Sequence, residues 1–368
     1  MNVLCVVGTR PEAIKLAPVI LELEERRGTG CSVCVTGQHR ELADDVLELF
    51  GIRPDHDLDL MTHDQSMSSV AAGVLTGVEP LLRKLEPDWV VVQGDTTTAM
   101  AGALAAFHAG VPVAHVEAGL RTGNLSAPFP EELNRRVVTM TAGLHLAPTP
   151  RAAANLRREG VADADIVVTG NTVVDALLHV TRLPFDPCGT PLRDVPLDDG
   201  ALVLLTAHRR ESFGEPLRHV FGAVRALVEH YRGAVRVVYP VHPNPAVRDA
   251  TAMLGGVDHV HLTPPVDYLS LVHLMRRSTL ILTDSGGIQE EAPSLSVPVL
   301  VLRDRSERPE AVEAGFARIV GTDGARILAA ACRLLDDPSA REAMRGTTNP
   351  YGDGHAGRRV VDALGATR

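Results

Sequence analysis

The sequence lacks an excess of basic residues: 36 Lys and Arg stand against 46 Asp and Glu, for a net charge of −10. This balance argues against non-specific nucleic-acid binding and against a basic protein of the membrane surface. No apolar run approaches the roughly 18 to 20 residues that a membrane-spanning helix needs. The first residues, Met1 to Gly8, lack the basic region and long apolar core of a signal peptide, so we expect a first strand there.

Cysteine is also scarce. Five cysteines are an odd number in a long chain, which favours reduced thiols and a cytoplasmic protein over a disulfide framework. Cys31 and Cys34 form a C-x-x-C pair, but they lie in a segment with the pattern of a strand. Residues three apart on a strand point to opposite faces, which disfavours redox chemistry or zinc binding by this pair. We predict no metal site.

With 45% hydrophobic and 22% charged residues, the chain has the composition of a protein that can bury large hydrophobic cores. Its 368 residues exceed what one ordinary core serves, so two domains are expected. Short apolar segments alternate with helix-compatible ones throughout, as at Asn2–Val7, Trp89–Gln93, Ala201–Thr206 and Leu280–Thr283. Nearly continuous apolar strands with helices between them indicate parallel sheets covered on both faces.

The alternation lapses between Leu183 and Gly200, where prolines, glycines and charges leave no helical period. We interpret this stretch as a connecting segment near a domain boundary. The prediction is an N-terminal domain at residues 1–170 and a C-terminal domain at residues 171–350, each a doubly wound α/β fold. Ligands of such folds bind beyond the carboxyl ends of the strands, so the cleft between two facing sheets is the expected site.

Carboxylates follow the strands of the first half. Asp95 comes directly after the Trp89–Gln93 strand and Gly94, where it is either a helix N-cap or a site carboxylate. Glu117 ends the next strand beside a glycine-punctuated loop, a place that a surface role explains less well. Glu131 lies in the first turn of a helix, where an acidic residue is favourable for capping alone.

The first strand leads into Gly8-Thr9-Arg10-Pro11-Glu12 rather than into G-x-G-x-x-G. A nicotinamide or flavin dinucleotide is therefore poorly supported. Arg10 and Lys15 place two cations near the start of the following helix, either as site residues or as solvated surface charges.

The second half supplies more cations at its strand ends. His208 and His242 each follow a strand, and Arg209 and Arg210 stand beside the first of them. A single histidine at a strand end is usually a hydrogen-bonded structural residue. Two histidines with neighbouring arginines favour a pocket for a diphosphate.

A glycine pair, Gly286 and Gly287, follows the Leu280–Thr283 strand and leads into a helix-compatible segment. A strand, a glycine turn and a helix start present free N–H groups that suit a phosphate, although a ligand-free turn has the same pattern. Glu291, one helical turn after Gly287, could reach ribose hydroxyls. A nucleotide diphosphate would thus bind the second half and present its attached group to the acids of the first.

These motifs together resemble the non-hydrolysing bacterial UDP-N-acetylglucosamine 2-epimerases. The resemblance runs in order from Asn2 to about Gly357. The matching stretches are Gly8–Lys15, Gly94–Thr98, His115–Gly123, His208–Phe213, Asp284–Ser294 and Asn349–Gly354.

The resemblance implies a GT-B-like pair of Rossmann-type domains, with the C-terminal helix, residues 351–368, completing the first domain. It also implies a homodimer that interconverts UDP-GlcNAc and UDP-ManNAc through 2-acetamidoglucal and UDP, without a cofactor. The residues that it implies for catalysis are Asp95, Glu117, Glu131 and His208. Those that it implies for binding substrate are Arg10, Lys15, Arg135, Arg209, His242, Ser285, Gly286, Gly287, Glu291 and Arg308. Some members are activated by UDP-GlcNAc at a second site, and Gln38, His39 and Gln65 match positions linked to it.

The sequence departs from the family pattern at four positions. Gln93 stands where many relatives have His, and Ala207 replaces a Gly before the His-Arg-Arg motif. Leu271 occupies a position where an aromatic residue often packs near uracil, and Asp64 one that is Arg in some activated members. Three alternatives to the epimerase are a hydrolysing relative that releases free ManNAc, a GT-B glycosyltransferase and a non-catalytic sensor.

Overall fold

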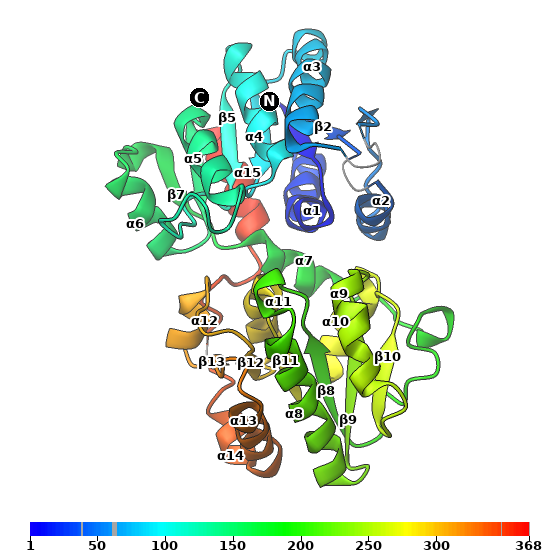
Figure 1. Cartoon of the computed structure of the whole chain (residues 1–368). Helices are drawn as coiled ribbons and strands as arrows, with labels where there is room; N and C mark the ends of the chain where they lie inside the picture. The colour runs from blue at the N-terminus through cyan, green and yellow to red at the C-terminus, as the bar shows by residue number, and fades with distance from the viewer. Residues whose placement is uncertain (38–39, 61–64, 347, 368) are drawn as a thin grey trace. The chain divides into compact units, whose positions relative to one another are not determined.

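The computed structural model describes residues 1–37, 40–60, 65–346 and 348–367, which form two compact units (Figure 1). Unit 1 comprises Met1–Ala176 and Tyr351–Arg368, and unit 2 comprises Leu177–Pro350. Each unit is built on one parallel β-sheet with helices between its strands. The predicted fold class, two doubly wound units of the Rossmann type, is confirmed.

Unit 1 contains a seven-stranded sheet in the order β3-β2-β1-β4-β5-β6-β7. Its strands are β1 (Asn2–Val7), β2 (Gly30–Val35), β3 (His56–Asp57), β4 (Trp89–Gln93), β5 (Val113–Val116), β6 (Leu144–Ala147) and β7 (Ile166–Val168). Every residue of β4 and β5 is buried, because helices cover these central strands on both faces.

The helices of unit 1 begin at recognisable signals. Ser66 caps α3 by accepting a hydrogen bond from the Ser69 N–H, and Pro11 occupies the first turn of α1. The helices are α1 (Arg10–Glu25), α2 (Arg40–Leu49), α3 (Met67–Leu85), α4 (Thr97–His108), α5 (Glu131–Thr141), α6 (Pro150–Arg158) and α15 (Ala356–Ala366). A further helix, α7 (Thr172–Val180), begins in unit 1 and ends in unit 2.

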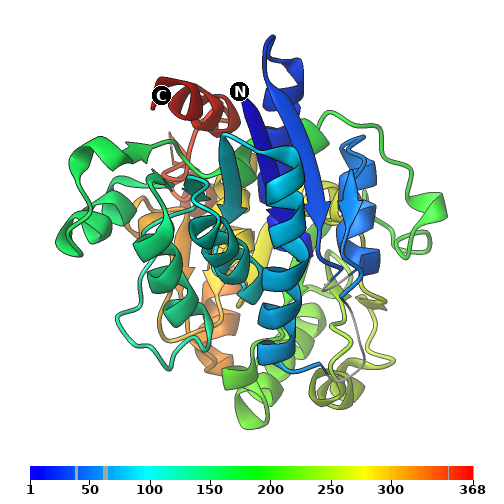
Figure 2. The same ribbon diagram turned by 90° about the horizontal axis from the view of Figure 1, so that it is seen from above.

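The C-terminal helix α15 packs against α1 (Figures 1 and 2). A Cβ atom at Gly357 would lie 2.9 Å from the Pro18 carbonyl oxygen, so only glycine permits this close approach. The Gly357 N–H also donates to Asp175 Oδ1 at 2.9 Å. The chain therefore returns to unit 1 after completing unit 2.

Unit 2 repeats the same strand order on a six-stranded sheet, β10-β9-β8-β11-β12-β13. Its strands are β8 (Ala201–Thr206), β9 (Val235–Pro240), β10 (Val260–Thr263), β11 (Leu280–Thr283), β12 (Val299–Val301) and β13 (Ala317–Ile319). Its helices are α8 (Glu215–Tyr231), α9 (Pro245–Thr251), α10 (Tyr268–Arg277), α11 (Gly286–Glu291), α12 (Pro309–Glu313), α13 (Gly324–Asp336) and α14 (Pro338–Glu342). Its main core includes Phe221 and Tyr239, whose rings lie 5.6 Å apart.

Three strands lie outside the segments that the sequence indicated: β3, β6 and β13. They are short, with two, four and three residues, and the first and last lie at sheet edges. Polar residues also interrupt them: His145 lies within β6 and Arg318 within β13, and β3 consists of His56 and Asp57, so none is a continuous apolar run. No described helix is long and apolar enough to span a membrane.

Candidate active site

The strand order of each sheet reverses at one point. In unit 1 this point lies between β1 and β4, which pair directly, and in unit 2 it lies between β8 and β11. The connections on either side of such a switch point diverge to opposite faces, which leaves a crevice at the carboxyl ends of the two strands. The candidate residues of each unit follow these strands and their neighbours.

Glu117 directly follows β5 and is held by two side chains of unit 1. Its backbone φ is +66°, an uncommon conformation for a residue with a Cβ. Lys15 Nζ, from α1, donates to Glu117 Oε2, and Asn171 Nδ2 donates to the same oxygen at 3.1 Å. The Lys15 and Glu117 side chains are only 10% and 7% exposed. A buried ammonium and an amide donor at one oxygen both stabilise the carboxylate form.

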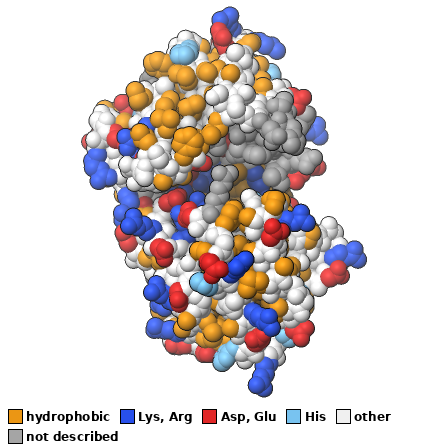
Figure 3. All heavy atoms as spheres, viewed as in Figure 1, with side chains coloured by type: hydrophobic (Ala, Val, Ile, Leu, Met, Phe, Trp, Pro, Cys, Tyr) orange, Lys and Arg blue, Asp and Glu red, His pale blue; other side chains and the backbone are white. Residues whose placement is uncertain are grey.

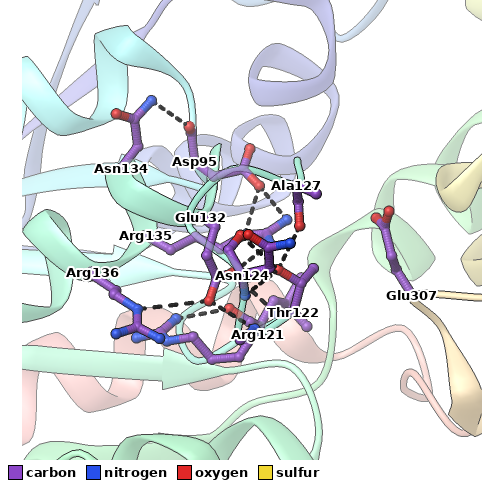
Figure 4. A network of polar contacts seen from close by, with 12 residues as sticks. Asp95, Arg121, Thr122, Asn124, Ala127, Glu132, Asn134, Arg135, Arg136 and Glu307 are labelled. Carbon is purple, nitrogen blue, oxygen red and sulfur yellow. Dashed lines mark hydrogen bonds and ion pairs between the residues drawn. The ribbon is translucent and has the colours of Figure 1, made fainter. Parts of the chain in front are cut away.

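Asp95 is paired with an arginine from α5 (Figure 4). Its Oδ2 accepts a hydrogen bond from Arg135 Nε at 2.8 Å and forms an ion pair with Arg135 Nη2 at 2.6 Å. The Asn134 side chain donates to the Asp95 carbonyl at 2.9 Å, which fixes the loop as well as the side chain. The N-cap of α4 is Thr96 rather than Asp95, so helix capping does not account for this carboxylate.

The adjacent Glu131 and Glu132 have different environments. Glu132 is fully buried and accepts from the backbone N–H groups of Thr122 at 3.0 Å and Gly123 at 3.1 Å, and from Arg135 Nη1 at 3.2 Å (Figure 4). Glu132 therefore holds the loop that precedes α5. By contrast, Glu131 Oε2 is buried without a hydrogen-bond partner among the described residues.

Glu12, in the first turn of α1, is a further buried carboxyl group and is only 1% exposed. Its Oε1 accepts a hydrogen bond from the Thr96 hydroxyl at 2.7 Å, and its Oε2 has no partner within the described parts of the chain. Burial raises the pKa of Glu12 to about 7, although hydrogen bonds from Thr9 and Thr96 oppose the shift. Glu12 belongs to the Gly8–Lys15 stretch, but no catalytic or binding role was predicted for it from the sequence.

In unit 2, Asp284 organises the turn after β8. It is fully buried, and its Oδ2 accepts from the backbone N–H groups of His208 at 2.7 Å and Arg209 at 2.8 Å. His208 Nδ1 lies 3.4 Å from Asp284 Oδ1, and the His208 ring stacks on His242 with the centroids 5.2 Å apart. Burial lowers the pKa of His208, with further lowering by His242 and Arg209, while Asp284 opposes the shift. The resulting imidazole is mainly neutral near pH 7.

Two guanidinium groups lie close to the glycine turn. A Cβ atom at Gly286 would be 3.7 Å from Arg209 Nη2 and 3.9 Å from Arg308 Nη2. The side chain of Arg308 pairs with the buried Glu290. Burial alone would raise the pKa of Glu307, but Arg209, Arg303 and Arg308 lower it below its usual range. The bare backbone at Gly286 thus adjoins a concentration of positive charge that suits an anion.

Glu291 lies at the end of α11 and is 5% exposed. Its Oε1 accepts from the Tyr268 hydroxyl at 2.6 Å, and a Cβ atom at Gly287 would be 3.9 Å from its Oε2. Ser285 caps α11, but its side chain makes no capping hydrogen bond. The carboxylate and the glycine pair therefore adjoin one another on one side of the turn.

The predicted site residues are distributed over both units. Those of unit 1 are Arg10, Lys15, Asp95, Glu117, Glu131 and Arg135, and those of unit 2 are His208, Arg209, His242, Ser285, Gly286, Gly287, Glu291 and Arg308. Of the residues matched to a second site, Gln65 immediately precedes the α3 cap, whereas Gln38 and His39, like Asp64, lie outside the described residues. The described residues contain no group of three or more His, Cys, Asp or Glu that could hold a metal ion.

The sequence did not single out Asp284 or Asn171 as functional residues. Both follow strands, β11 and β7, so the rule that identified Asp95 and Glu117 would have found them. Asn134 and Glu132 had no such signal, because their partners lie in a loop far from them in the sequence.

Comparisons with known proteins show similarity to one enzyme family over almost the whole chain. The family model described as UDP-N-acetylglucosamine 2-epimerase matches residues 21–365. The UDP-N-acetylglucosamine 2-epimerase of Escherichia coli K12 is 49% identical over 370 residues, covering 99% of this chain and 98% of the relative. The crystal structure of the UDP-GlcNAc 2-epimerase of Neisseria meningitidis, bound to UDP-GlcNAc, is 43% identical, covers both chains completely and has a TM-score of 0.92.

A more distant structure has the same fold over the whole chain. The Methanocaldococcus jannaschii UDP-GlcNAc 2-epimerase, in complex with UDP-GlcNAc and UDP, is 33% identical, covers 100% of both chains and has a TM-score of 0.81. The resemblance seen in the motifs is thus a relationship over the full length. This chain belongs to the UDP-N-acetylglucosamine 2-epimerase family.

Proposed function

We propose that this protein interconverts UDP-GlcNAc and UDP-ManNAc by elimination and re-addition of UDP. The bond between C1 and the phosphate oxygen breaks with its electron pair going to UDP, a carboxylate takes the C2 proton, and a C1–C2 double bond forms. UDP then adds back to the resulting 2-acetamidoglucal as a proton is delivered to the other face of C2. The steps balance without an oxidant, a reductant or another cofactor.

The observation that carries this proposal is the set of three carboxylates in unit 1, each in its own environment. The C2 proton is very weakly acidic until the departure of UDP builds positive charge at C1. Inversion at C2 needs proton acceptors and donors on both faces, and therefore more than one acid. Asp95 is paired with an arginine, Glu117 with a lysine and an amide, and one oxygen of Glu131 has no partner among the described residues.

The environment of Glu117 suits a base, because two donors keep it in the form that accepts a proton. Asp95 and Glu131 are proposed as the other acids, with no assignment of a face to either. Arg135 orients Asp95 and so acts through it, and Lys15 supplies positive charge at Glu117. Arg10, the first residue of α1, is proposed as a further cation of the substrate site.

Unit 2 is proposed to bind and release UDP. The glycine pair, Ser285 and the guanidinium groups of Arg209 and Arg308 provide the diphosphate site. Glu291 binds the ribose hydroxyls, and His208 with His242 lies beside the leaving group. Support comes from the relatives, since the N. meningitidis structure contains UDP-GlcNAc and the M. jannaschii structure UDP-GlcNAc and UDP.

Incubation with UDP-GlcNAc in D₂O tests the proposal. The expected product is UDP-ManNAc with deuterium at C2, because the removed proton exchanges with solvent before C2 is reprotonated. UDP-ManNAc without deuterium would contradict the elimination mechanism. Stoichiometric UDP with free ManNAc would indicate a hydrolysing enzyme, and unchanged UDP-GlcNAc would indicate a glycosyltransferase awaiting an acceptor or a sensor.

We also propose that the chain forms a homodimer through unit 1 in the cytoplasm. Unit 1 carries most of the large hydrophobic side chains that the described residues expose, among them Phe107 (57%), Leu133 (44%) and Met140 (82%). These residues lie on α4 and α5, which pack against each other, and Figure 3 shows hydrophobic side chains gathered on one face of unit 1. Static light scattering should give twice the chain mass, and Met140→Glu should lower it; a monomer at micromolar concentration would contradict the dimer.

A further inference from the structure

The structure points to Asn171 as a residue that positions Glu117 for proton transfer, a role that rests on the proposed function of Glu117. Asn171 lies between β7 and α7 and is 2% exposed. Its Nδ2 donates to Glu117 Oε2 at 3.1 Å, the same oxygen that receives Lys15 Nζ. One carboxylate oxygen of Glu117 is thus occupied by donors from two different elements.

The Asn171 amide can face Glu117 in only one orientation. Its Oδ1 accepts a hydrogen bond at 3.1 Å from the Val173 N–H in the first turn of α7. A backbone N–H can only donate, so Oδ1 must point to Val173 and Nδ2 must point away from it. The helix start therefore fixes the amide with its donor side towards Glu117.

The backbone of Asn171 is held as firmly as its side chain. Its N–H donates to the Tyr351 carbonyl at 2.7 Å, where the chain re-enters unit 1. A Cβ atom at the preceding Gly170 would lie 3.4 Å from that same carbonyl oxygen, and φ at Gly170 is +88°. The Asn171 carbonyl also accepts from the Val174 N–H at 3.1 Å, so four hydrogen bonds fix this residue and one of them reaches the proposed base.

This arrangement has a chemical consequence for Glu117. The amide donor favours the ionised carboxylate, which keeps Glu117 deprotonated and oriented, and because it carries no charge it lowers the basicity of Glu117 less than a second cation would. It also restricts rotation of a carboxylate whose backbone φ of +66° already sets its direction. Loss of the donor should therefore reduce turnover, while UDP binding by unit 2 stays intact.

Two substitutions separate positioning from a merely structural role, because Asn, Asp and Ser cap helices about equally well. Asn171→Ser keeps the α7 cap and removes the donor, whereas Asn171→Asp keeps the cap and places a second carboxylate against Glu117. We expect kcat for epimerisation to fall about tenfold for Asn171→Ser and about 10²-fold or more for Asn171→Asp. KM for UDP-GlcNAc and the Kd for UDP should change little in both variants. Tm should change little in Asn171→Ser and fall in Asn171→Asp, where two carboxylates meet at a buried site.

Asn124→Asp is the matched control, since this exposed residue accepts from the Ser126 N–H at 2.9 Å through Oδ1, which the carboxylate retains. Its kcat should equal that of the wild type. The inference is overturned if Asn171→Asp turns over as fast as Asn171→Ser, or if both stay within threefold of the wild type.

A double-mutant cycle with Glu117→Gln decides the matter even if Asn171→Asp fails to fold. If Asn171 acts through Glu117, Asn171→Ser should add almost nothing to the loss caused by Glu117→Gln alone. Additive losses would overturn the inference. A wild-type protein that produces no UDP-ManNAc would instead contradict the proposed function, so the two failures are distinguishable.

Discussion

Units 1 and 2 have the same strand order around their switch points, yet their strand ends carry opposite chemistry. In unit 1 two carboxylates, Asp95 and Glu117, are each paired with a cation and are proposed to handle protons. In unit 2 a buried carboxylate, Asp284, serves the backbone, and the guanidinium groups adjoin a bare glycine turn. The comparison teaches that one topology supplies two crevices, while the residues after the strands decide whether a crevice handles protons or anions.

The largest expected effect comes from removing the charge of an acid in unit 1. Asp95→Asn keeps the shape of the side chain but weakens its pairing with Arg135, so kcat should fall about 10²- to 10⁴-fold. The Kd for UDP should stay within about twofold, because that ligand is assigned to unit 2. Steady-state kinetics and titration calorimetry measure the two quantities.

The matched control is Asp163→Asn, an Asp that pairs with Arg157 but is 77% exposed. Exposed pairs contribute little, so this variant should keep wild-type turnover and stability. An Asp95→Asn variant with full activity would remove Asp95 from the mechanism and break the contrast between the units.

The raised pKa of the buried Glu12 predicts that the free energy of unfolding of unit 1 depends on pH. Its pKa is raised from 4.5 to about 7, so between these values the folded state keeps a proton that the unfolded chain loses. The contribution of Glu12 is complete below pH 4.5 and is lost as pH rises to about 7, with a fall of about 3 kcal/mol in the free energy of unfolding. Glu12→Gln cannot titrate and should gain on the wild type across this range.

Urea unfolding at pH 4.5 and pH 8 measures this difference, with Glu25→Gln as the control because Glu25 is an exposed residue of the same helix. The free energy of unfolding of Glu12→Gln, relative to that of the wild type, should be larger at pH 8 than at pH 4.5. An equal gap at both pH values would mean that Glu12 titrates alike in the folded and unfolded states.

Asp95→Asn is expected to lower kcat and leave UDP binding intact, whereas removal of a cation from unit 2 should weaken UDP binding. Arg209→Met retains much of the side-chain volume but not the guanidinium beside Gly286. UDP affinity should fall about 10- to 100-fold, the worth of a charged hydrogen bond. Arg218→Met provides the control, since Arg218 is 62% exposed and pairs only with Glu215 among the partners seen. Unchanged UDP affinity in Arg209→Met would place the diphosphate elsewhere.

Much of this contrast could be predicted from the sequence, because strand ends are local features. The strands β1, β4, β8 and β11 match the sequence segments residue for residue. These strands flank the two switch points, and several candidate polar residues follow them directly in the sequence. Burial of these central strands makes them continuous apolar runs, which are the strongest local signal. The short strands β3, β6 and β13 gave no comparable signal.

Pairings between distant segments could not be predicted in this way. The contact of Lys15 with Glu117 joins residues 102 positions apart, and that of Arg135 with Asp95 joins residues 40 apart. Neither separation follows from a helical or strand period. The different environments of Glu131 and Glu132 likewise depend on which side of α5 faces the loop at Thr122, which the two adjacent letters do not reveal.

The smallest expected effect concerns Leu271, a half-buried residue of α10 at a position where the family resemblance predicts an aromatic side chain near uracil. It lies one turn after Tyr268, whose hydroxyl donates to Glu291 at 2.6 Å, so the two side chains share a helix face next to the proposed ribose site. Leu271→Tyr should tighten UDP binding about two- to tenfold through stacking on uracil, with kcat unchanged. Met253→Tyr, at an exposed position of unit 2, should leave the Kd as it is. Because Leu271 is assigned only to nucleotide binding, a change in kcat without a change in the Kd of UDP would contradict its proposed place beside the uracil.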